Sequence, residues 1–299
     1  MNKIDPLPRA AGLGFVGDHI DRADHIRTDD AALERAINAP AAVRLCLDGL
    51  DPVVEGGMLL REPMPADASV AAHVLLGLDD DDPVFVRLAQ DLPHGANFAS
   101  HVWKVAGILK PEELALYGTA RSLVDWHSRH GFCAVCGGAT SPAKGGWSRR
   151  CGRCDAEHFP RVDPVTIMLA EHDGRVLVGR QHRWPQGRYS ALAGFVEPGE
   201  TVEGAVAREL YEEAGVRAYN VRYVMSQPWP FPSTLMIACM AEVESDALTL
   251  DPHEIEDAIW VDATGVRAAI EGRTDAPFIA PPVMAVAHHL LLHWLERCT

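Results

Sequence analysis

After Pro160 the chain alternates short apolar runs with turn residues, a pattern that predicts a sheet of short strands. Asp173-Gly174 separates the first two runs and is a strong two-residue hairpin signal. Helical periodicity follows at 264–272 and 282–297. A mixed sheet with a helix on each side accounts for this order. The expected strands are 165–170, 175–179, 189–193, 221–226, 235–243 and 258–262.

The first 130 residues give a weaker pattern and no mark of chemistry. Two strand-like runs, 71–78 and 84–88, flank the acidic turn 79–82. Helical spacing of apolar residues then covers 110–130, with Pro111 suited to the first turn. We therefore expect an N-terminal α/β domain before the sheet described above.

The most informative stretch is 194–216, GFVEPGETVEGAVARELYEEAGV. Pro198-Gly199 is a turn signal, and good helix formers run from about Thr201 to Gly215, which suits a C-terminal cap. At 100° per residue, Glu209 and Glu213 fall in the middle of the apolar face of this helix. That face is made of Val202, Ala205, Val206 and Leu210.

Two interpretations of these glutamates compete. A solvated acidic helix with an Arg208–Glu212 pair at i,i+4 spacing is the ordinary one, but such a helix keeps its acids away from its apolar stripe. Crowded carboxylates raise each other's pKa unless a hard cation lies among them, and Mg²⁺ accepts such oxygen ligands. The pattern therefore favours a divalent-metal site.

The same stretch resembles the signature of the Nudix hydrolases, G-x5-E-x7-R-E-U-x-E-E-x-G-U, where U is apolar. Every fixed position matches, and seven fixed positions would match a chain of this length by chance with a probability of about 10⁻⁶. The resemblance implies metal-assisted hydrolysis of a pyrophosphate and an α/β/α sandwich. The matching residues are Gly194, Glu200, Arg208, Glu209, Leu210, Glu212, Glu213, Gly215 and Val216.

Composition and charge bound the interpretation. The 299 residues are 47% hydrophobic, with a formal net charge of −15 that opposes general nucleic-acid affinity. Residues 141–188 carry 9 Lys/Arg against 5 Asp/Glu and are the one net-positive segment, immediately before the glutamate helix. An anionic substrate would approach there, although dispersed surface arginines explain the excess equally well. Without a basic start and long apolar run at 1–15, we expect a soluble, cytoplasmic protein with no membrane contact.

Four cysteines form two C-x2-C pairs separated by fourteen residues. Disulfides are disfavoured because no secretion signal is present, and redox activity because nothing nearby resembles a thioredoxin-type unit. The spacing indicates a tetrahedral Zn²⁺ site, structural because four thiolates leave the metal no open position. Its ligands would be Cys133, Cys136, Cys151 and Cys154, whereas Cys46, Cys239 and Cys298 have no partner at useful spacing.

After the glutamate helix comes SQPWPFPSTLM, residues 226–236. Alternating prolines fix an extended backbone that presents Trp229 and Phe231, which alone suits either a ligand for another domain or a rigid loop. Beside the Nudix signature it resembles the S-Q-P-W-P-F-P-x-S motif of the NAD(H) pyrophosphatase branch, as does the cysteine ribbon upstream. Thr234 replaces the final serine and keeps its hydroxyl.

This resemblance implies roles for particular residues. Glu209, Glu213, Glu254 and the carbonyl of Ala193 would bind catalytic Mg²⁺ or Mn²⁺, with Glu212 also available, and Arg208 would orient the glutamates. Phe159 and Phe195 match aromatic positions that stack on adenine, and Ala287 matches a small residue near the substrate. Gly146 stands at the position, just before Trp147, where some relatives have an acidic substrate contact. The loop contacts would come from Gln227, Pro228, Trp229, Pro230, Phe231, Pro232, Ser233 and Thr234.

We therefore expect an N-terminal domain over 1–130, a zinc ribbon over 131–160 and a Nudix catalytic domain over 161–299. The expected reaction cleaves NADH or NAD⁺ to nicotinamide mononucleotide and AMP, and the family permits removal of NAD caps from RNA. A homodimer is implied because the counterpart of Phe159 reaches the other subunit's site. The alternatives are hydrolysis of ADP-ribose or another dinucleotide and, from a different class, a non-catalytic zinc-ribbon nucleotide sensor.

Overall fold

The apolar runs after Pro160 form one six-stranded sheet in the computed structural model, which describes residues 12–17, 19–89, 92, 102 and 105–298. The strand order is β15-β16-β12-β13-β17, with β14 paired to β12. The strands are β12 (Asp163–His172), β13 (Arg175–Arg180), β14 (Leu192–Phe195), β15 (Ala218–Trp229), β16 (Thr234–Val243) and β17 (Asp257–Asp262).

The sheet is mixed, as predicted. β12 runs parallel to β16 and antiparallel to β13 and β14, and β13 runs antiparallel to β17. Asp173 and Gly174 close the β12–β13 hairpin with φ of 46° and 69°, the left-handed conformations that a type I′ turn requires. The hairpin prediction is confirmed.

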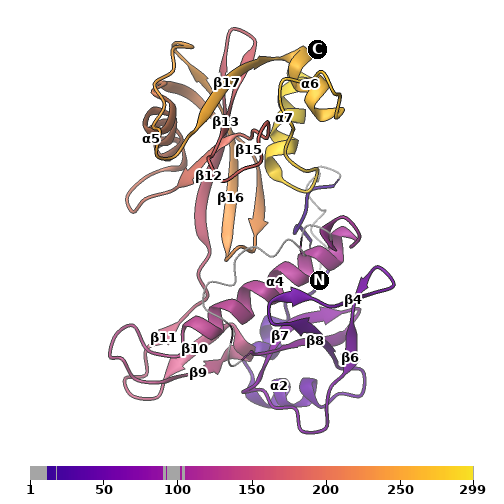
Figure 1. Ribbon diagram of the computed structural model, residues 1–299. Helices are drawn as coiled ribbons and strands as arrows, with labels where there is room; N and C mark the ends of the chain where they lie inside the picture. The colour runs from indigo at the N-terminus through magenta and orange to yellow at the C-terminus, as the bar shows by residue number, and fades with distance from the viewer. Residues whose placement is uncertain (1–11, 18, 90–91, 93–101, 103–104, 299) are drawn as a thin grey trace. The chain divides into compact units, whose positions relative to one another are not determined.

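Helices cover both faces of this sheet (Figure 1). The helix α5 (Val202–Ala214) packs Val206, Leu210 and Ala214 against alternate residues of β12 and β16. The helices α6 (Ala263–Ile270) and α7 (Val286–Arg297) contact the sheet as well, and α7 buries Leu290, Leu291 and Trp294 completely. The predicted α/β/α sandwich is therefore present.

The helix α7 begins four residues later than the pattern predicts. The segment 282–285 is held in another conformation because the Met284 carbonyl accepts hydrogen bonds from the Gly14 amide (2.9 Å) and the Gln227 side chain (2.7 Å). The latter two residues lie 270 and 57 positions away in the chain, so no local signal could place this helix start.

A separate compact unit contains Phe15–Val162 and Trp229–Ser233. Its four-stranded sheet has the order β6-β1-β8-β7, and Figure 1 shows α2 and α4 on opposite faces of it. The elements are α1 (Asp24–Arg27), α2 (Asp30–Ile37), β1 (Val43–Leu45), β2 (Leu47–Asp48), β3 (Asp51–Pro52), β4 (Val54–Glu55), β5 (Met58–Leu59), β6 (Arg61–Pro63), β7 (His73–Asp79), β8 (Asp82–Arg87) and α4 (Pro111–Arg129).

Long α4 anchors this unit, and its bounds match the helix predicted from apolar spacing. Leu75 and Phe85 pack toward α2, so their strand neighbours, including Val74 and Val86, face α4. The carboxylate of Glu113 in the first turn of α4 is 7% exposed and accepts hydrogen bonds from the Leu59 amide (2.8 Å) and the Arg61 guanidinium (2.6 Å). Replacing Glu113 alone would leave the buried Leu59 amide without this acceptor.

The cysteine segment forms a small three-stranded sheet of order β11-β10-β9. A 3-10 turn, η1 (Lys144–Gly146), connects β9 to β10. The segment belongs to the same compact unit as the N-terminal sheet. The ribbon strands are β9 (Thr140–Ala143), β10 (Ser148–Cys151) and β11 (Glu157–His158).

Over the described residues, no helix has both the length and the apolar character needed to cross a bilayer.

Candidate active site

The helix that carries the glutamates is set by its own ends. The Thr201 hydroxyl accepts a hydrogen bond from the Gly204 amide (3.1 Å) and caps the N-terminus. Gly215 ends the helix at φ 73°, where its amide donates to the Tyr211 carbonyl (2.9 Å) and the Val216 amide donates to the Leu210 carbonyl (3.3 Å). These caps fix where the helix begins and ends, and so determine which of its residues face the sheet.

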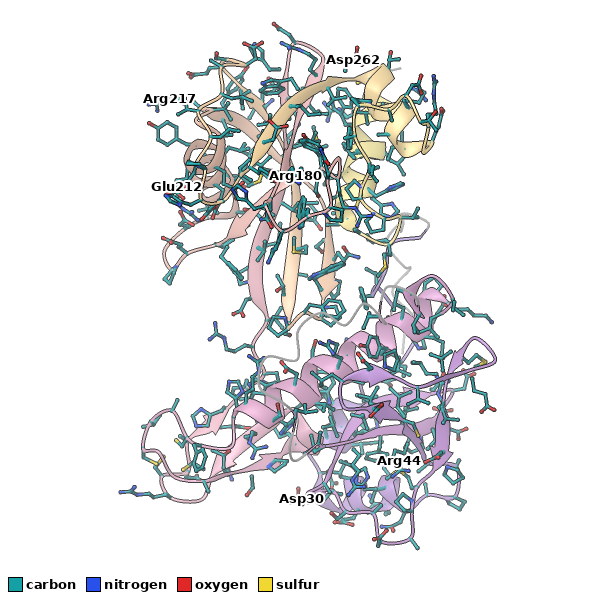
Figure 2. The ribbon with its side chains drawn as sticks, viewed as in Figure 1. Asp30, Arg44, Arg180, Glu212, Arg217 and Asp262 are labelled. Carbon is teal, nitrogen blue, oxygen red and sulfur yellow. The ribbon has the colours of Figure 1, made fainter. Side chains whose placement is uncertain are left out.

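Glu209 and Glu213 lie on that face and are almost completely buried, at 8% and 3% exposure. Val206 and Leu210, their neighbours on the helix, are core residues with no exposure. Glu212, labelled in Figure 2, points outward and is exposed. The helical wheel therefore placed the two carboxylates correctly, among core residues and away from the solvated side.

Arg208 joins the helix to the loop before it. Its guanidinium makes a bidentate pair with Glu200, at 2.6 Å from Nε and 2.9 Å from Nη2. The same guanidinium donates to Glu209 (2.8 Å), to Glu212 (2.9 Å) and to the carbonyl of Phe195 (2.8 Å). These hydrogen bonds, led by the one to Glu200, raise the pKa of Arg208, which remains a permanent cation among three carboxylates.

The sequence pattern assigned no role to Glu200, although this residue matches a fixed position of the Nudix signature. Besides its pair with Arg208, it accepts a hydrogen bond from the Glu197 amide (2.9 Å). The Arg208 hydrogen bond is the main reason that the pKa of Glu200 is lowered to about 2. The available signal was the eight-residue separation of Glu200 from Arg208, which is about two helical turns and puts the two side chains on one side of the helix start.

The glycine that opens the signature is required by close approach. A Cβ atom on Gly194 would lie 1.8 Å from the Glu209 carboxyl carbon and 2.0 Å from its Oε1. The strand β14 thus passes directly over the Glu209 carboxylate, and Ala193, the predicted carbonyl ligand, is the preceding residue in this strand. Only glycine leaves room for the carboxylate here.

Glu213 is a buried carboxylate whose Oε2 has no hydrogen-bond partner among the described residues. Burial first, and then the charges of Glu209, Glu254 and Asp251, raise the pKa of Glu213 to about 8. Burial likewise raises the pKa of Glu209, which Arg208 partly offsets. An unsatisfied buried carboxylate surrounded by other carboxylates is costly unless a cation joins the group.

The loop that contains Glu254 is tied directly to this helix. The Asp251 amide donates to the Glu213 carbonyl (3.1 Å), and the Glu254 amide donates to the Asp251 carbonyl (3.2 Å). Glu254 itself is exposed, and its charge acts on both buried glutamates. The carboxylates of α5 and of this loop therefore act on one another electrostatically, and hard divalent cations prefer oxygen donors of this kind. The residues fit a catalytic metal site.

The four predicted zinc ligands also come together. The ligand atoms of Cys133, Cys136, Cys151 and Cys154 all lie within 4.8 Å of one another. Each pair forms the expected knuckle, with the Val135 amide donating to Cys133 Sγ and the Arg153 amide to Cys151 Sγ, both at 3.4 Å. No disulfide joins the cysteines. Four thiolates in this arrangement suit structural Zn²⁺.

The loop predicted to contact substrate has two parts. Gln227 is completely buried, and its amide nitrogen donates to the carbonyls of Gly14 (2.8 Å) and Met284 (2.7 Å). Its oxygen accepts from the Val286 amide (2.8 Å), which caps the first turn of α7. This side chain is fully occupied by the protein's own backbone. Exposed Pro228 and buried Thr234 bound the remaining loop.

The aromatic part of the loop packs within the first unit. The rings of Trp229 and Phe231 lie 5.5 Å apart, and each lies 5.7 Å from Phe15 in an edge-to-face arrangement. Arg121 of α4 donates to the Pro230 carbonyl (2.9 Å) and lies 4.8 Å over Phe231. The peptide bond from Phe231 to Pro232 is cis. Exposed Pro232 and partly buried Ser233 complete the turn.

The two predicted stacking aromatics are both available. Phe195 is 60% exposed directly after Gly194, and Phe159 is 59% exposed at the end of the ribbon, beneath Lys144 at 5.2 Å. Ala287 in the first turn of α7 is buried. Gly146 has φ 87°, and a Cβ there would lie 2.6 Å from Val74, so packing requires a glycine at this position.

Comparisons with known proteins agree with this geometry. The NUDIX domain model matches residues 160–280, and the NADH pyrophosphatase zinc ribbon domain model matches residues 128–159. The chain is 34% identical over 310 residues to the NAD-capped RNA hydrolase NudC of Mycobacterium bovis, covering 92% of each chain. It is 38% identical over 183 residues to the NAD-capped RNA hydrolase NudC of Salmonella heidelberg, covering 61% of this chain and 67% of that one.

A human relative has a higher identity but matches over less than half of its own length. The chain is 45% identical over 198 residues to human NAD-capped RNA hydrolase NUDT12, which covers 63% of this chain. The match spans 43% of the human protein's length. It therefore supports the shared region alone.

Proposed function

Because the chain belongs to the Nudix hydrolase family, in the branch with an NADH pyrophosphatase zinc ribbon, we propose that it hydrolyses the pyrophosphate of NADH and NAD⁺. The products would be nicotinamide mononucleotide and AMP. The relatives named as NAD-capped RNA hydrolases support a second substrate, the NAD cap of an RNA 5′ end. Both substrates present the same bond to the glutamates of α5.

One observation carries this proposal: Glu213 is 3% exposed and has a carboxylate oxygen without a partner, beside a second buried glutamate. Folding does not gain from such a group, since an apolar residue of the same size would be more stable there. A divalent cation gives the group its partner, and a pyrophosphate is the kind of substrate whose charge such a cation neutralises.

The proposed metal ligands are Glu209, Glu213, Glu254 and the carbonyl of Ala193, with Glu212 nearby. Mg²⁺ or Mn²⁺ bound there would neutralise phosphate oxygens and acidify an attacking water. Arg208 holds Glu209 and Glu212 in place through the hydrogen bonds described above, and thus keeps the donor set preorganised.

The dinucleotide would be held by residues outside the glutamate helix. Phe195 and Phe159 offer exposed ring faces for stacking on adenine, and the loop from Pro228 to Thr234 with Ala287 would contact the remainder. Arg208 fixes the backbone of Phe195 through its carbonyl (2.8 Å), so the stacking ring and the metal ligands share one support.

Product identification tests the proposal. Purified protein is incubated with NADH and Mg²⁺ or Mn²⁺, and the products are separated chromatographically. Nicotinamide mononucleotide together with AMP is the expected result. Activity on ADP-ribose with none on NADH would contradict the substrate assignment, and tight NADH binding without turnover would indicate a nucleotide sensor.

A homodimer belongs to the same proposal. Phe159 is a large exposed aromatic at the end of the ribbon, and the resemblance to this branch implies that it reaches the other subunit's site. We therefore place Phe159 of each subunit in the adenine site of the other. This arrangement makes a complete site dependent on two chains.

A further inference from the structure

Two exposed arginines lie in the loop between β13 and β14, residues 181–191. Arg183 donates to the side chain of Gln181 (3.0 Å), and neither Arg183 nor Arg188 has a carboxylate partner within the part of the chain that the structure describes. No acidic residue occurs between 181 and 191. The loop therefore presents positive charge that the protein itself does not neutralise.

This loop is fixed beside the loop that carries Glu254. His182 donates to the Pro252 carbonyl (2.9 Å), and the Glu256 amide donates to the Arg180 carbonyl (2.8 Å). Arg180, labelled in Figure 2, also forms an ion pair with Glu256. Since the Asp251 amide also bonds to the Glu213 carbonyl, the start of the 181–191 loop is joined through the Glu254 loop to the end of α5.

The other end of the loop is equally well held. The Ile279 amide donates to the Gly187 carbonyl (2.7 Å), and the Tyr189 amide donates to the Ile279 carbonyl (3.4 Å). Inside the loop, turns close from Trp184 to Gln181 (3.0 Å) and from Arg188 to Pro185 (3.1 Å). The arginines are thus carried on a defined backbone, which reduces the entropy lost on binding a ligand.

The cations of the zinc ribbon, unlike Arg183 and Arg188, are mostly engaged by other groups of the protein. Lys144 pairs with Glu157 (2.8 Å) and Arg150 pairs with Asp155 (3.3 Å). Arg153 donates to the Cys136 carbonyl (3.3 Å). Residues 141–188 carry more Lys and Arg than Asp and Glu. Most of the cations among them that can still bind an external anion therefore lie in the 181–191 loop.

We propose that Arg183 and Arg188 bind backbone phosphates of the RNA chain that follows an NAD cap, and so determine the preference for capped RNA over the free dinucleotide. This rests on the proposed pyrophosphatase function, since the cap must occupy the α5 site for the chain to pass this loop. The free dinucleotide has no phosphates beyond its pyrophosphate and gains nothing from the contact.

The size of the effect follows from electrostatics. Each phosphate contact on a single strand contributes about 0.7 to the slope of log affinity against log salt concentration. Two contacts would contribute about 1.4. Elsewhere the net charge of −15 repels RNA, so we expect the contact to involve only the first nucleotides after the cap.

The test compares the double variant Arg183→Gln/Arg188→Gln with the control Arg267→Gln/Arg297→Gln. Arg267 and Arg297 belong to α6 and α7, and this pair removes the same charge from the protein. For each protein, kcat/KM is measured on a short NAD-capped single-stranded RNA and on NADH at several salt concentrations. The readout is the ratio of the two values.

We expect the loop variant to lower the RNA-to-NADH ratio about tenfold at low salt and to reduce its salt slope by about 1.4. The control should leave both unchanged. An equal loss on the two substrates, an unchanged ratio, or the same loss in the control would overturn the proposal.

Binding of the capped RNA is measured in parallel by fluorescence anisotropy with Ca²⁺ in place of Mg²⁺. If neither the wild type nor the variants hydrolyse NADH, the proposed function is wrong. The binding measurement still shows whether Arg183 and Arg188 contact RNA. Wild-type binding that is weakened at least threefold in the loop variant supports the contact, and equal binding refutes it.

Discussion

The close approach of the Gly194 backbone to the Glu209 carboxylate fixes the position of this proposed metal ligand. Alanine at position 194 would place its Cβ 1.8 Å from the Glu209 carboxyl carbon, so the strand or the carboxylate must move. We predict that Gly194→Ala lowers kcat/KM by at least about 100-fold, because a misplacement of about 1 Å in a preorganised site has that effect. Mn²⁺ titration by calorimetry should show weaker metal binding.

Gly204 provides the matched control. It lies in the first turn of α5, where an added Cβ meets nothing closer than the Thr201 hydroxyl at 3.4 Å. Gly204→Ala should raise the free energy of unfolding by about 0.5–1 kcal/mol and leave activity unchanged. Equal activity loss in both variants would show that the helix, and not the approach of Gly194 to Glu209, is the sensitive feature.

His127 predicts a pH dependence of stability. Its Nε2 donates to the Gly146 carbonyl (2.7 Å) and its Nδ1 accepts from Arg149 (2.7 Å), which specifies the neutral ring. Burial, with the Arg149 charge contributing, lowers the pKa of His127 from 6.5 to about 4. Since the unfolded chain binds the proton more tightly, stability is complete above about pH 6.5 and falls toward pH 4, by at most about 3 kcal/mol.

Urea unfolding between pH 4 and 7 measures this effect. His127→Gln keeps a donor for the Gly146 carbonyl and cannot take up a proton, so the midpoint of this variant should change less over that range than the midpoint of the wild type. An identical pH slope in the two proteins would exclude His127 as its source.

The zinc ribbon predicts a dependence of stability on bound metal that can be measured separately from catalysis. We expect Cys151→Ser to release zinc and to lower the melting temperature of the protein, because four thiolates gathered without a cation repel one another and tie the strands together only when metal is bound. Metal analysis and calorimetry provide the measurement. Cys298→Ser, at an exposed cysteine outside the set, is the control. A variant at Cys151 that still holds one zinc per chain contradicts the assignment.

At the scale of elements, local patterns predicted what local forces determine. The caps of α5, the hairpin at Asp173-Gly174 and the cysteine knuckles follow from neighbouring residues, and the structure confirms them. Gln227 is different, because its role depends on Gly14 and Met284, which are remote in the chain. The motif predicts a substrate contact for Gln227, and the structure adds that its buried side chain holds the start of α7.

For the whole molecule, periodicity was sufficient to predict the sandwich but not the order of its strands. The parallel pairing of β12 with β16 joins residues more than 70 positions apart, and no spacing encodes it. The grouping of the ribbon with the N-terminal sheet depends on contacts such as His127 with Gly146 and Arg149. The three-domain division of the sequence therefore remains a prediction about independent folding.

The proposed dimer predicts complementation between two inactive variants. Phe159→Ala and Glu213→Gln should each reduce NADH hydrolysis, and subunit exchange between them should restore it, because one site of the mixed dimer has both residues intact. The mass in solution should be twice the chain's 32.5 kDa. Activity that stays low after verified exchange would show that Phe159 serves the site of its own chain.

The central claim is that the glutamates on the apolar face of α5 exist for chemistry and not for folding. Glu213→Gln tests it most directly, by steady-state NADH hydrolysis and thermal unfolding of one preparation. We predict a loss of turnover of at least about 100-fold with an unchanged or higher melting temperature, since the change removes a buried, unpartnered carboxylate. A variant that remains active but melts earlier would contradict the claim.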